Sequence, residues 1–319
     1  MNNKKINMYL MILTWGIISA ETLRVGGSGN YSTIQSAIDA ASENDTILVA
    51  SGTYVETIQT NTKLFLLGSG SDNTTIYSGG KTVSLLNGTW GSTIKGFRIE
   101  STGDAALNIT DNKKTKVIEC VIKNSFTGLS RQNQSAVVVY GAGNEDDVEF
   151  YNCVFIESVN GIYASTYGAL NIFNSIFYKT TGTAIYLYSI TNANVQNSIF
   201  LDNGATVYIS SNSKMTLAYN LFHSNNNDSH DGSALGTIAA DPKFTDITKS
   251  YVLSSDSPAI NKGNASSSFN DPDGTRNDMG VYGGSYSWSK GPAITALSIS
   301  SASVEQGTSI TITATAKSK

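Results

Sequence analysis

A short apolar phrase returns at regular intervals along the middle of the chain. The fourth residues of its copies lie 33, 22, 23 and 22 positions apart. A period in the low twenties, built from β-branched and aromatic runs, indicates a solenoid whose repeats stack on their neighbours. The five copies are Val117-Ile-Glu-Cys-Val-Ile122, Phe150-Tyr-Asn-Cys-Val-Phe155, Ile172-Phe-Asn-Ser-Ile-Phe177, Val195-Gln-Asn-Ser-Ile-Phe200 and Leu217-Ala-Tyr-Asn-Leu-Phe222.

A second apolar run lies between successive copies, and the turns between runs are too short for a crossover helix. Without such helices, parallel strands pair only if equivalent strands stack coil on coil. We therefore predict an all-β parallel β-helix with two to three short strands per turn. The second runs lie at 106–109, 136–140, 161–163, 184–188 and 206–209, and earlier strands are expected at 46–50, 53–58, 64–67, 74–77 and 82–86.

The one helix we expect lies ahead of these repeats. Ser32-Thr-Ile-Gln35 matches a capping box, and apolar residues then recur at helical spacing up to Ala41. Asn44 and Asp45 end the pattern. A solenoid end exposes unpaired backbone groups, so we predict that this helix covers the first coil.

The first 20 residues are typical of a signal peptide. Lys4 and Lys5 precede the apolar run Met8–Ile18, and small residues allow cleavage before Glu21. An uncleaved anchor is the alternative. We expect a monomer at the cell surface or secreted, not membrane-spanning after cleavage. The net charge of −4 lacks the basic excess that phosphate binding needs, so we expect no nucleic-acid partner.

Two stretches carry a family resemblance. Tyr31-Ser-Thr-Ile-Gln-Ser-Ala-Ile-Asp-Ala-Ala41 with Gly52-Thr-Tyr-Val-Glu56 resembles the opening of right-handed parallel β-helix proteins of the pectin-lyase-like superfamily. Asp271-Pro-Asp-Gly-Thr-Arg276 with Asp278-Met-Gly-Val-Tyr282 is similar to their closing segment. The resemblance implies a right-handed β-helix over residues 21–289. It implies no single activity, because the superfamily includes lyases, hydrolases, esterases and adhesins.

Catalytic motifs of the better-known relatives are missing from the sequence. Gly52-Thr-Tyr-Val-Glu56 resembles one early pectinesterase motif, but the later aspartate-bearing motifs of that family are not found. The paired-aspartate, Gly-His-Gly and Arg-Ile-Lys motifs of polygalacturonases are also absent. A lyase needs mainly a base, yet nothing groups Arg131, Lys179 and Lys214. His223 and His230 have no nucleophile in a recognisable setting, so no catalytic residue is assigned.

The final residues, 290–319, change in character. Alternating runs at 296–300, 303–307 and 309–315 resemble the first strands of a bacterial Ig-like module. A complete sandwich of this kind needs about a hundred residues. We therefore expect a linker and an incomplete Ig-like segment, belonging to a longer protein.

Cys120 and Cys153 hold the same position in successive copies of the repeat. Adjacent parallel strands lie about 4.8 Å apart, within reach of a disulfide. The alternative is a pair of small apolar fillers in a buried column. Ser175 and Ser198 continue this column without any possible bond, which favours fillers.

The interval between Cys120 and Cys153 exceeds one period by about eleven residues. We expect the segment from Arg131 to Asp147 to bulge from one coil and to wall a groove. Arg131, Glu145, Asp146 and Asp147 are the candidate catalytic residues, for glycoside hydrolysis or Ca²⁺-assisted β-elimination. A solvated turn without function is the alternative.

The segment Asp271-Pro-Asp-Gly-Thr-Arg-Asn-Asp278 places short carboxylates around a glycine turn. Asp271, Asp273 and Asp278 are therefore a candidate Ca²⁺ site, although the closing glutamate of an EF-hand loop is absent. In the alternative, Arg276 pairs with an aspartate and fixes the last coil.

Two functions remain open from the sequence. The first is a secreted or cell-surface β-helix that associates with, and in one version cleaves, an acidic polysaccharide. The second is a non-enzymatic, adhesin-like surface protein whose β-helix is a rigid rod. The export signal and the fold agree with both, and whether the chain is an enzyme is left undecided.

Overall fold

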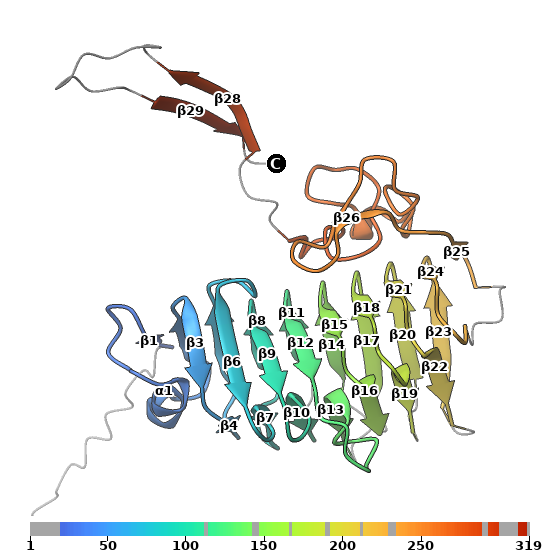
Figure 1. Cartoon of the computed structure of the whole chain (residues 1–319). Helices are drawn as coiled ribbons and strands as arrows, with labels where there is room; N and C mark the ends of the chain where they lie inside the picture. Colours follow the sequence, from blue (N-terminus) through green and yellow to red (C-terminus); the bar gives the residue numbers. More distant parts are fainter. Residues whose placement is uncertain are drawn as a thin grey trace, which may run out of the picture.

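The computed structural model describes residues 20–111, 114–141, 147–165, 168–188, 192–210, 213–228 and 234–288, and the backbone of 293–299 and 312–317. The signal-like residues 1–19 lie outside it. The chain winds into a solenoid with three parallel sheets along its length (Figure 1). Each full coil contributes one strand to each sheet, which agrees with the predicted two to three strands per turn.

We name the sheets A, B and C, in the order in which the chain passes through them. Sheet A comprises β1 (Thr22–Val25), β2 (Thr46–Val49), β5 (Phe65–Gly68), β8 (Thr93–Lys95), β11 (Thr115–Ile118), β14 (Val148–Tyr151), β17 (Ala169–Phe173), β20 (Asn192–Gln196) and β23 (Met215–Ala218). Sheet B comprises β3 (Gly52–Val55), β6 (Thr74–Ser78), β9 (Arg98–Ser101), β12 (Val121–Asn124), β15 (Val154–Ile156), β18 (Ile176–Tyr178), β21 (Ile199–Leu201), β24 (Leu221–His223) and β25 (Ile238–Ala239). Sheet C comprises β4 (Ile58–Thr60), β7 (Val83–Leu85), β10 (Leu107–Thr110), β13 (Ser135–Tyr140), β16 (Asn160–Ser165), β19 (Thr183–Leu187) and β22 (Ala205–Ile209).

Each copy of the repeated phrase spans the corner between sheets A and B, and so contributes to two strands. The residue after the sheet A strand has a left-handed backbone, for example Asn152 at φ 52° and Asn174 at φ 50°. Asparagine adopts this conformation more readily than most residues. The sharp corner lets a short, nearly continuous apolar phrase turn from one sheet to the next.

The fourth position of each phrase forms a buried ladder inside this corner. Ser175 Oγ accepts from the backbone N–H of Cys153 at 3.2 Å, and Ser198 Oγ accepts from Ser175 N–H at 3.1 Å. Asn220 Oδ1 continues the ladder to Ser198 N–H at 2.9 Å. Cys120 and Cys153 are buried free thiols, and burial raises the pKa of Cys120 to about 12. The filler interpretation of the two cysteines is therefore confirmed.

An aromatic stack fills the solenoid interior behind sheet B. Phe155, Phe177, Phe200 and Phe222 lie in register, with ring centroids 4.6, 4.9 and 4.9 Å apart. These spacings follow the distance between parallel strands, so one phenylalanine per coil builds a continuous core.

Helix α1 (Ile34–Ala40) covers the first coil, as predicted, and buries Ile34, Ala37 and Ile38. Its N-cap is Thr33, whose Oγ1 accepts from Ser36 N–H at 3.2 Å, so the predicted capping box is wrong by one residue. The first turn of α1 contains no acidic residue, and Glu56, from outside the helix, provides a carboxylate there. Its two oxygens accept from Ile34 and Gln35 N–H at 2.9 and 3.0 Å. The glutamate of the Gly52–Glu56 motif therefore has a structural role in this chain.

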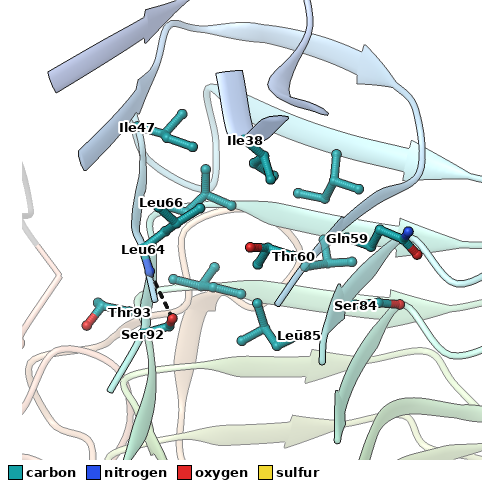
Figure 2. Close-up of a pocket in the computed structure, with 13 residues that line it drawn as sticks. Ile38, Ile47, Gln59, Thr60, Leu64, Leu66, Ser84, Leu85, Ser92 and Thr93 are labelled. Atoms are coloured by element: carbon teal, nitrogen blue, oxygen red, sulfur yellow. Dashed lines mark hydrogen bonds between the residues drawn. The ribbon is translucent and has the colours of Figure 1, made fainter. Parts of the chain in front are cut away.

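Figure 2 shows an internal gap beneath helix α1. Its space of about 10 Å³ is at the lower limit for one water molecule. Among the polar residues that line it, Ser92 accepts through Oγ from Leu64 N–H at 3.1 Å (Figure 2). The gap is a packing defect of the core and offers no binding site.

The segment after β25 returns over the outer face of sheet B, which is apolar in the coils of β15, β18 and β21. Tyr251, Met279 and Val281 are buried in one cluster with sheet B residues such as Ile176 and Ile199. The segment contains β26 (Phe244–Asp246), β27 (Val252–Leu253) and the 3₁₀ helix η1 (Ser267–Phe269). Hydrogen bonds between this segment and asparagines of the solenoid add to the packing. Sheet B is therefore closed to ligands along these coils.

The last described strands, β28 (Ala293–Ile299) and β29 (Ile312–Lys317), pair as an antiparallel hairpin. They overlap the strands predicted at 296–300 and 309–315, whereas the strand predicted at 303–307 lies outside the described residues. The Ig-like assignment stays a prediction. Among the described residues, no helix is long and apolar enough to cross a membrane.

Candidate functional site

The extra residues between Cys120 and Cys153 are divided between two corners, and the prediction of one bulge is wrong. Residues 125–134 connect β12 to β13, and residues 141–147 connect β13 to β14. The equivalent corners of the next coil comprise only 157–159 and 166–168. The spacing of the repeat counts the additional residues, but it cannot say which corner holds them.

This division separates the predicted catalytic residues. Arg131 precedes β13 and Asp147 follows it, and a strand of this length, six residues, spans about 20 Å. Asp147 Oδ1 accepts from Ala169 N–H at 3.1 Å, so this carboxylate orders the corner of the next coil. Glu145 and Asp146 lie outside the described residues. Arg131 and Asp147 therefore do not form one catalytic cluster.

Tyrosines gather on the outer face of sheet C instead. Tyr163, Tyr186 and Tyr208 occupy the same register position in β16, β19 and β22. Their ring centroids lie 5.5 and 4.4 Å apart, with nearly parallel ring planes. We call these three residues the tyrosine ladder. One ring per coil follows directly from the parallel register.

Two further tyrosines flank the ladder. Tyr188 stacks against Tyr163, with 6.4 Å between ring centroids. Tyr140, in β13, is 42% exposed, and Tyr188 and Tyr208 are 54% and 48% exposed. Tyr163 and Tyr186 are buried, at 6% and 7% exposure, so Tyr140, Tyr188 and Tyr208 form the exposed aromatic surface of this face. A folded chain normally exposes large apolar side chains singly, so such a group on one face indicates a binding surface.

Arg131 and Gln132, from the long corner before β13, lie over this face. The Arg131 guanidinium carbon is 4.8 Å from the Tyr186 ring centroid, and Gln132 Nε2 donates to Tyr140 Oη at 3.1 Å. No carboxylate pairs with Arg131 within the described ranges. A shallow cleft of about 220 Å³ results, which we call the tyrosine cleft, and Ser130, Arg131, Gln132, Tyr163, Tyr186 and Tyr188 line it.

The cleft has the chemistry of a binding site. Burial raises the pKa of Tyr163 and of Tyr186, so both phenols keep their protons at neutral pH. The cleft offers phenol hydroxyl groups that donate and accept hydrogen bonds, the exposed ring of Tyr188 and one permanent cation, Arg131. Sugars present the matching groups, namely hydroxyls, C–H surfaces and, in acidic glycans, carboxylates.

The basic residues considered as lyase bases do not gather here. Lys179 lies in a different groove, of about 510 Å³, which Glu157 and Asp202 also line. Its Nζ is 4.9 Å from the Tyr178 ring centroid, and the neighbouring phenol raises the pKa of Lys179. A lysine with a raised pKa retains its proton and is a poor base. Lys214 lies in the corner before β23, beyond sheet C.

The three aspartates proposed for Ca²⁺ are each engaged by the backbone. Asp271 Oδ1 accepts from Gly284 N–H at 2.6 Å, and Asp273 Oδ1 accepts from Thr275 N–H at 3.0 Å. Asp278 Oδ1 accepts from Asn261 N–H at 2.7 Å.

No group of three His, Cys, Asp or Glu side chains suited to a metal occurs in the described part of the chain. The Ca²⁺ site stays a prediction. Arg276 donates to the carbonyl oxygens of Gly263 and Lys262 at 2.7 and 3.3 Å, where the sequence had suggested an aspartate. It does tie down the closing turn. His223 lies partly buried in β24, and His230 lies outside the described residues.

Sequence reasoning missed the tyrosine ladder, although a signal was present. Tyr163, Tyr186 and Tyr208 are spaced by 23 and 22 residues, which is the period of the repeat. An aromatic residue that recurs with the period on the outward-facing positions predicts a surface ladder.

Comparisons with known proteins concern the fold. Residues 135–268 match a family described as "Right handed beta helix region". No curated protein matches the sequence. A pectin methylesterase from carrot is 15% identical, with a TM-score of 0.42 over 70% of this chain and 89% of that chain. Pectin methylesterase PemA from Erwinia chrysanthemi is 12% identical, with a TM-score of 0.39 over 65% and 78%.

Pectate lyase Pel9A is 14% identical, with a TM-score of 0.40 over 83% of this chain and 96% of that chain. Likeness at these values transfers no residue role or substrate. The family match and the three parallel sheets together confirm the predicted architecture.

Proposed function

We propose that this right-handed parallel β-helix protein binds an acidic polysaccharide on the outer face of sheet C, in the tyrosine cleft. The observation that carries the proposal is Arg131, a cation without a carboxylate partner among the described residues, held 4.8 Å from the Tyr186 ring centroid. A charged group beside aromatic surface is suited to a sugar that bears a carboxylate.

The polar groups of the cleft favour binding over cleavage. Glycoside hydrolysis needs two carboxyl groups on either side of one bond, and β-elimination needs a base that is free to accept a proton. The cleft is lined by hydroxyl, amide and guanidinium groups. The role proposed here is therefore that of a carbohydrate-binding surface, whether or not other parts of the protein carry a catalyst.

A binding assay with purified protein tests the proposal. Pectate, alginate and chondroitin sulfate would be compared with neutral β-glucan by affinity gel electrophoresis, with ultraviolet absorbance monitored for unsaturated products. We expect retardation by at least one acidic glycan and no absorbance increase. Equal mobility in all gels would contradict the proposal, and rising absorbance would show that the protein also cleaves.

A matched pair of arginine variants locates the site. Arg131→Gln should weaken binding about ten- to hundredfold, because a hydrogen bond to a charged group contributes about 1.5–3 kcal/mol. Arg24→Gln, on the exposed side of β1 in sheet A, is the control and should leave binding unchanged. Equal affinities of the two variants would place the glycan elsewhere.

We also propose export to the cell surface or medium, on the strength of the basic and apolar residues before Glu21. N-terminal sequencing of the protein recovered outside the cell should begin at Glu21. Recovery only inside the cell, with Met1 intact, would contradict this.

A further inference from the structure

A second column of side chains runs beside the tyrosine ladder, where the strands of sheet C end. The N–H of Tyr188 donates to the Ala164 carbonyl at 2.8 Å, which places Tyr188 next to Ser165 in the neighbouring coil. The column alternates between aromatic and small residues from one coil to the next. In chain order it reads Thr110, Tyr140, Ser165, Tyr188 and Ser210.

The aromatic members of this column project from the surface at every second coil. Tyr140 and Tyr188 are 42% and 54% exposed, whereas the serine between them is small. Parallel strands lie about 4.8 Å apart, so the two tyrosine positions are about 10 Å apart along the solenoid axis. Figure 1 shows β13, β16, β19 and β22, which carry this column, side by side along that axis.

We propose that the bound glycan lies along the solenoid axis and is a β-1,4-linked ribbon that repeats every two sugars. This inference rests on the proposed function. In such a ribbon each pyranose is turned over relative to the one before it, so alternate sugars present the same face. One disaccharide has nearly the length of two coil spacings. Alternate sugars then meet Tyr140 and Tyr188, and the sugar between them lies over Ser165.

The column does not fit a chain with three-fold helical symmetry. Such a chain, for example oligogalacturonate, presents the same face at every third sugar. Three coils beyond Tyr140 the column holds Ser210, which offers no ring. A chain lying across the coils would meet only one ring of the column. The two-coil alternation therefore selects a flat ribbon parallel to the axis.

Arg131 adds a charge requirement to this geometry. The guanidinium lies beside Tyr186 in β19, and Tyr188 follows two residues later in the same coil, just after this strand ends. A carboxylate on the sugar near Tyr188 would be within reach of the guanidinium. The structure thus favours an acidic ribbon such as β-1,4-linked mannuronate over a neutral ribbon and over a three-fold acidic chain.

Calorimetric titration with three defined hexasaccharides tests the inference. We expect hexamannuronate to bind the whole protein at least tenfold more tightly than hexagalacturonate, and also more tightly than cellohexaose. Ser165→Tyr fills the recess and should weaken hexamannuronate binding at least tenfold. Tyr188→Ser removes a ring without adding bulk and should do the same. Tyr77→Ser, on sheet B, is the control and should have no effect.

The outcomes separate this inference from the function on which it rests. Equal affinity for both acidic hexasaccharides, together with unchanged binding by Ser165→Tyr and Tyr188→Ser, would overturn the two-coil repeat. If binding were still weakened by Arg131→Gln, the proposed function would stand. If none of these variants altered binding, both the two-coil repeat and the proposed binding in the tyrosine cleft would be contradicted.

Discussion

Single side chains hold the corners of the solenoid by hydrogen-bonding the backbone of a neighbouring coil. Ser198 Oγ is buried and accepts from Ser175 N–H at 3.1 Å, while donating to the Gln196 carbonyl at 3.1 Å. A buried N–H without a partner costs about 1–3 kcal/mol. The polar residues of this column thus satisfy groups that a wholly apolar column would leave unpaired.

Replacing Ser198 tests the ladder. Ser198→Ala should lower the free energy of unfolding by about 1–3 kcal/mol, because Ser175 N–H loses its acceptor. Urea unfolding followed by circular dichroism would measure this. Ser268→Ala, at an exposed position of η1, should change it by less than about 0.5 kcal/mol. Equal stability of the two variants would show that water or a neighbour replaces the hydroxyl.

Asp271 gives the protein a pH-dependent stability. Burial, with Asp278 and Asp273 nearby, raises its pKa to about 6, although N–H bonds from Gly284 and Asp278 oppose the shift. An unfolded aspartate titrates near 3.9. The folded state therefore binds the proton more tightly. The contribution of Asp271 to stability is fully present below about pH 4 and is lost as the pH rises through about 6.

An isosteric variant isolates this effect. Wild-type protein should lose at most about 3 kcal/mol of unfolding free energy at this site between pH 4 and pH 7, since each pKa unit corresponds to about 1.4 kcal/mol. In Asp271→Asn this loss should be absent, and in the exposed control Asp228→Asn it should persist. Urea titrations at several pH values would measure it. Parallel stability curves for wild type and Asp271→Asn would contradict the assignment.

At the scale of elements, the first turn of helix α1 is stabilised by Glu56, the residue that follows β3. Glu56 accepts two N–H groups from the first turn of the helix, and a carboxylate at this position also faces the positive end of the helix dipole. Glu56→Ala should destabilise the protein by about 1–2 kcal/mol. Thermal unfolding would show this as a lowered midpoint. Glu43→Ala, exposed after the same helix, should leave the midpoint unchanged.

Some features of the fold and of the site could be predicted from the sequence, and others could not. The period, helix α1 and the buried column were predictable, because each depends on residues that recur at a regular spacing in the sequence. The sequence left open whether each coil has two strands or three, because one left-handed residue such as Asn152 turns the chain without glycine or proline. The tyrosine cleft depends on which corner lengthens, and residue spacing does not contain this information. The sequence identified Arg131 as a candidate residue, but it did not predict that Arg131 lies beside Tyr186.

At the scale of the whole molecule, the C-terminal segment closes the outer face of sheet B. Asn152 Nδ2 donates to the carbonyl oxygens of Val281 and Gly283 at 2.9 and 2.7 Å, and its own carbonyl accepts from Trp288 Nε1 at 2.7 Å. This segment packs on sheet B and leaves the outer face of sheet C uncovered. Left-handed asparagines of the repeat are therefore both corner residues and anchors for the closing segment.

Trp288 is the last of these anchors before the hairpin. Its ring packs edge-on against Tyr251 and Tyr282, with centroids 5.6 and 6.2 Å away. Trp288→Ala removes this packing and the bond to Asn152. We expect faster amide exchange throughout residues 239–288, increased binding of a hydrophobic dye to the uncovered sheet B, and a loss of about 2 kcal/mol in unfolding free energy.

Trp90→Ala is the matched control, because Trp90 also donates through Nε1, to the Asp111 carbonyl at 3.1 Å, but is 49% exposed. It should leave exchange in 239–288 unchanged. Since sheet C faces away from the closing segment, Trp288→Ala should also retain glycan binding in the tyrosine cleft. Loss of glycan binding in this variant would contradict this expectation and would mean that the closing segment and sheet C form one cooperative unit.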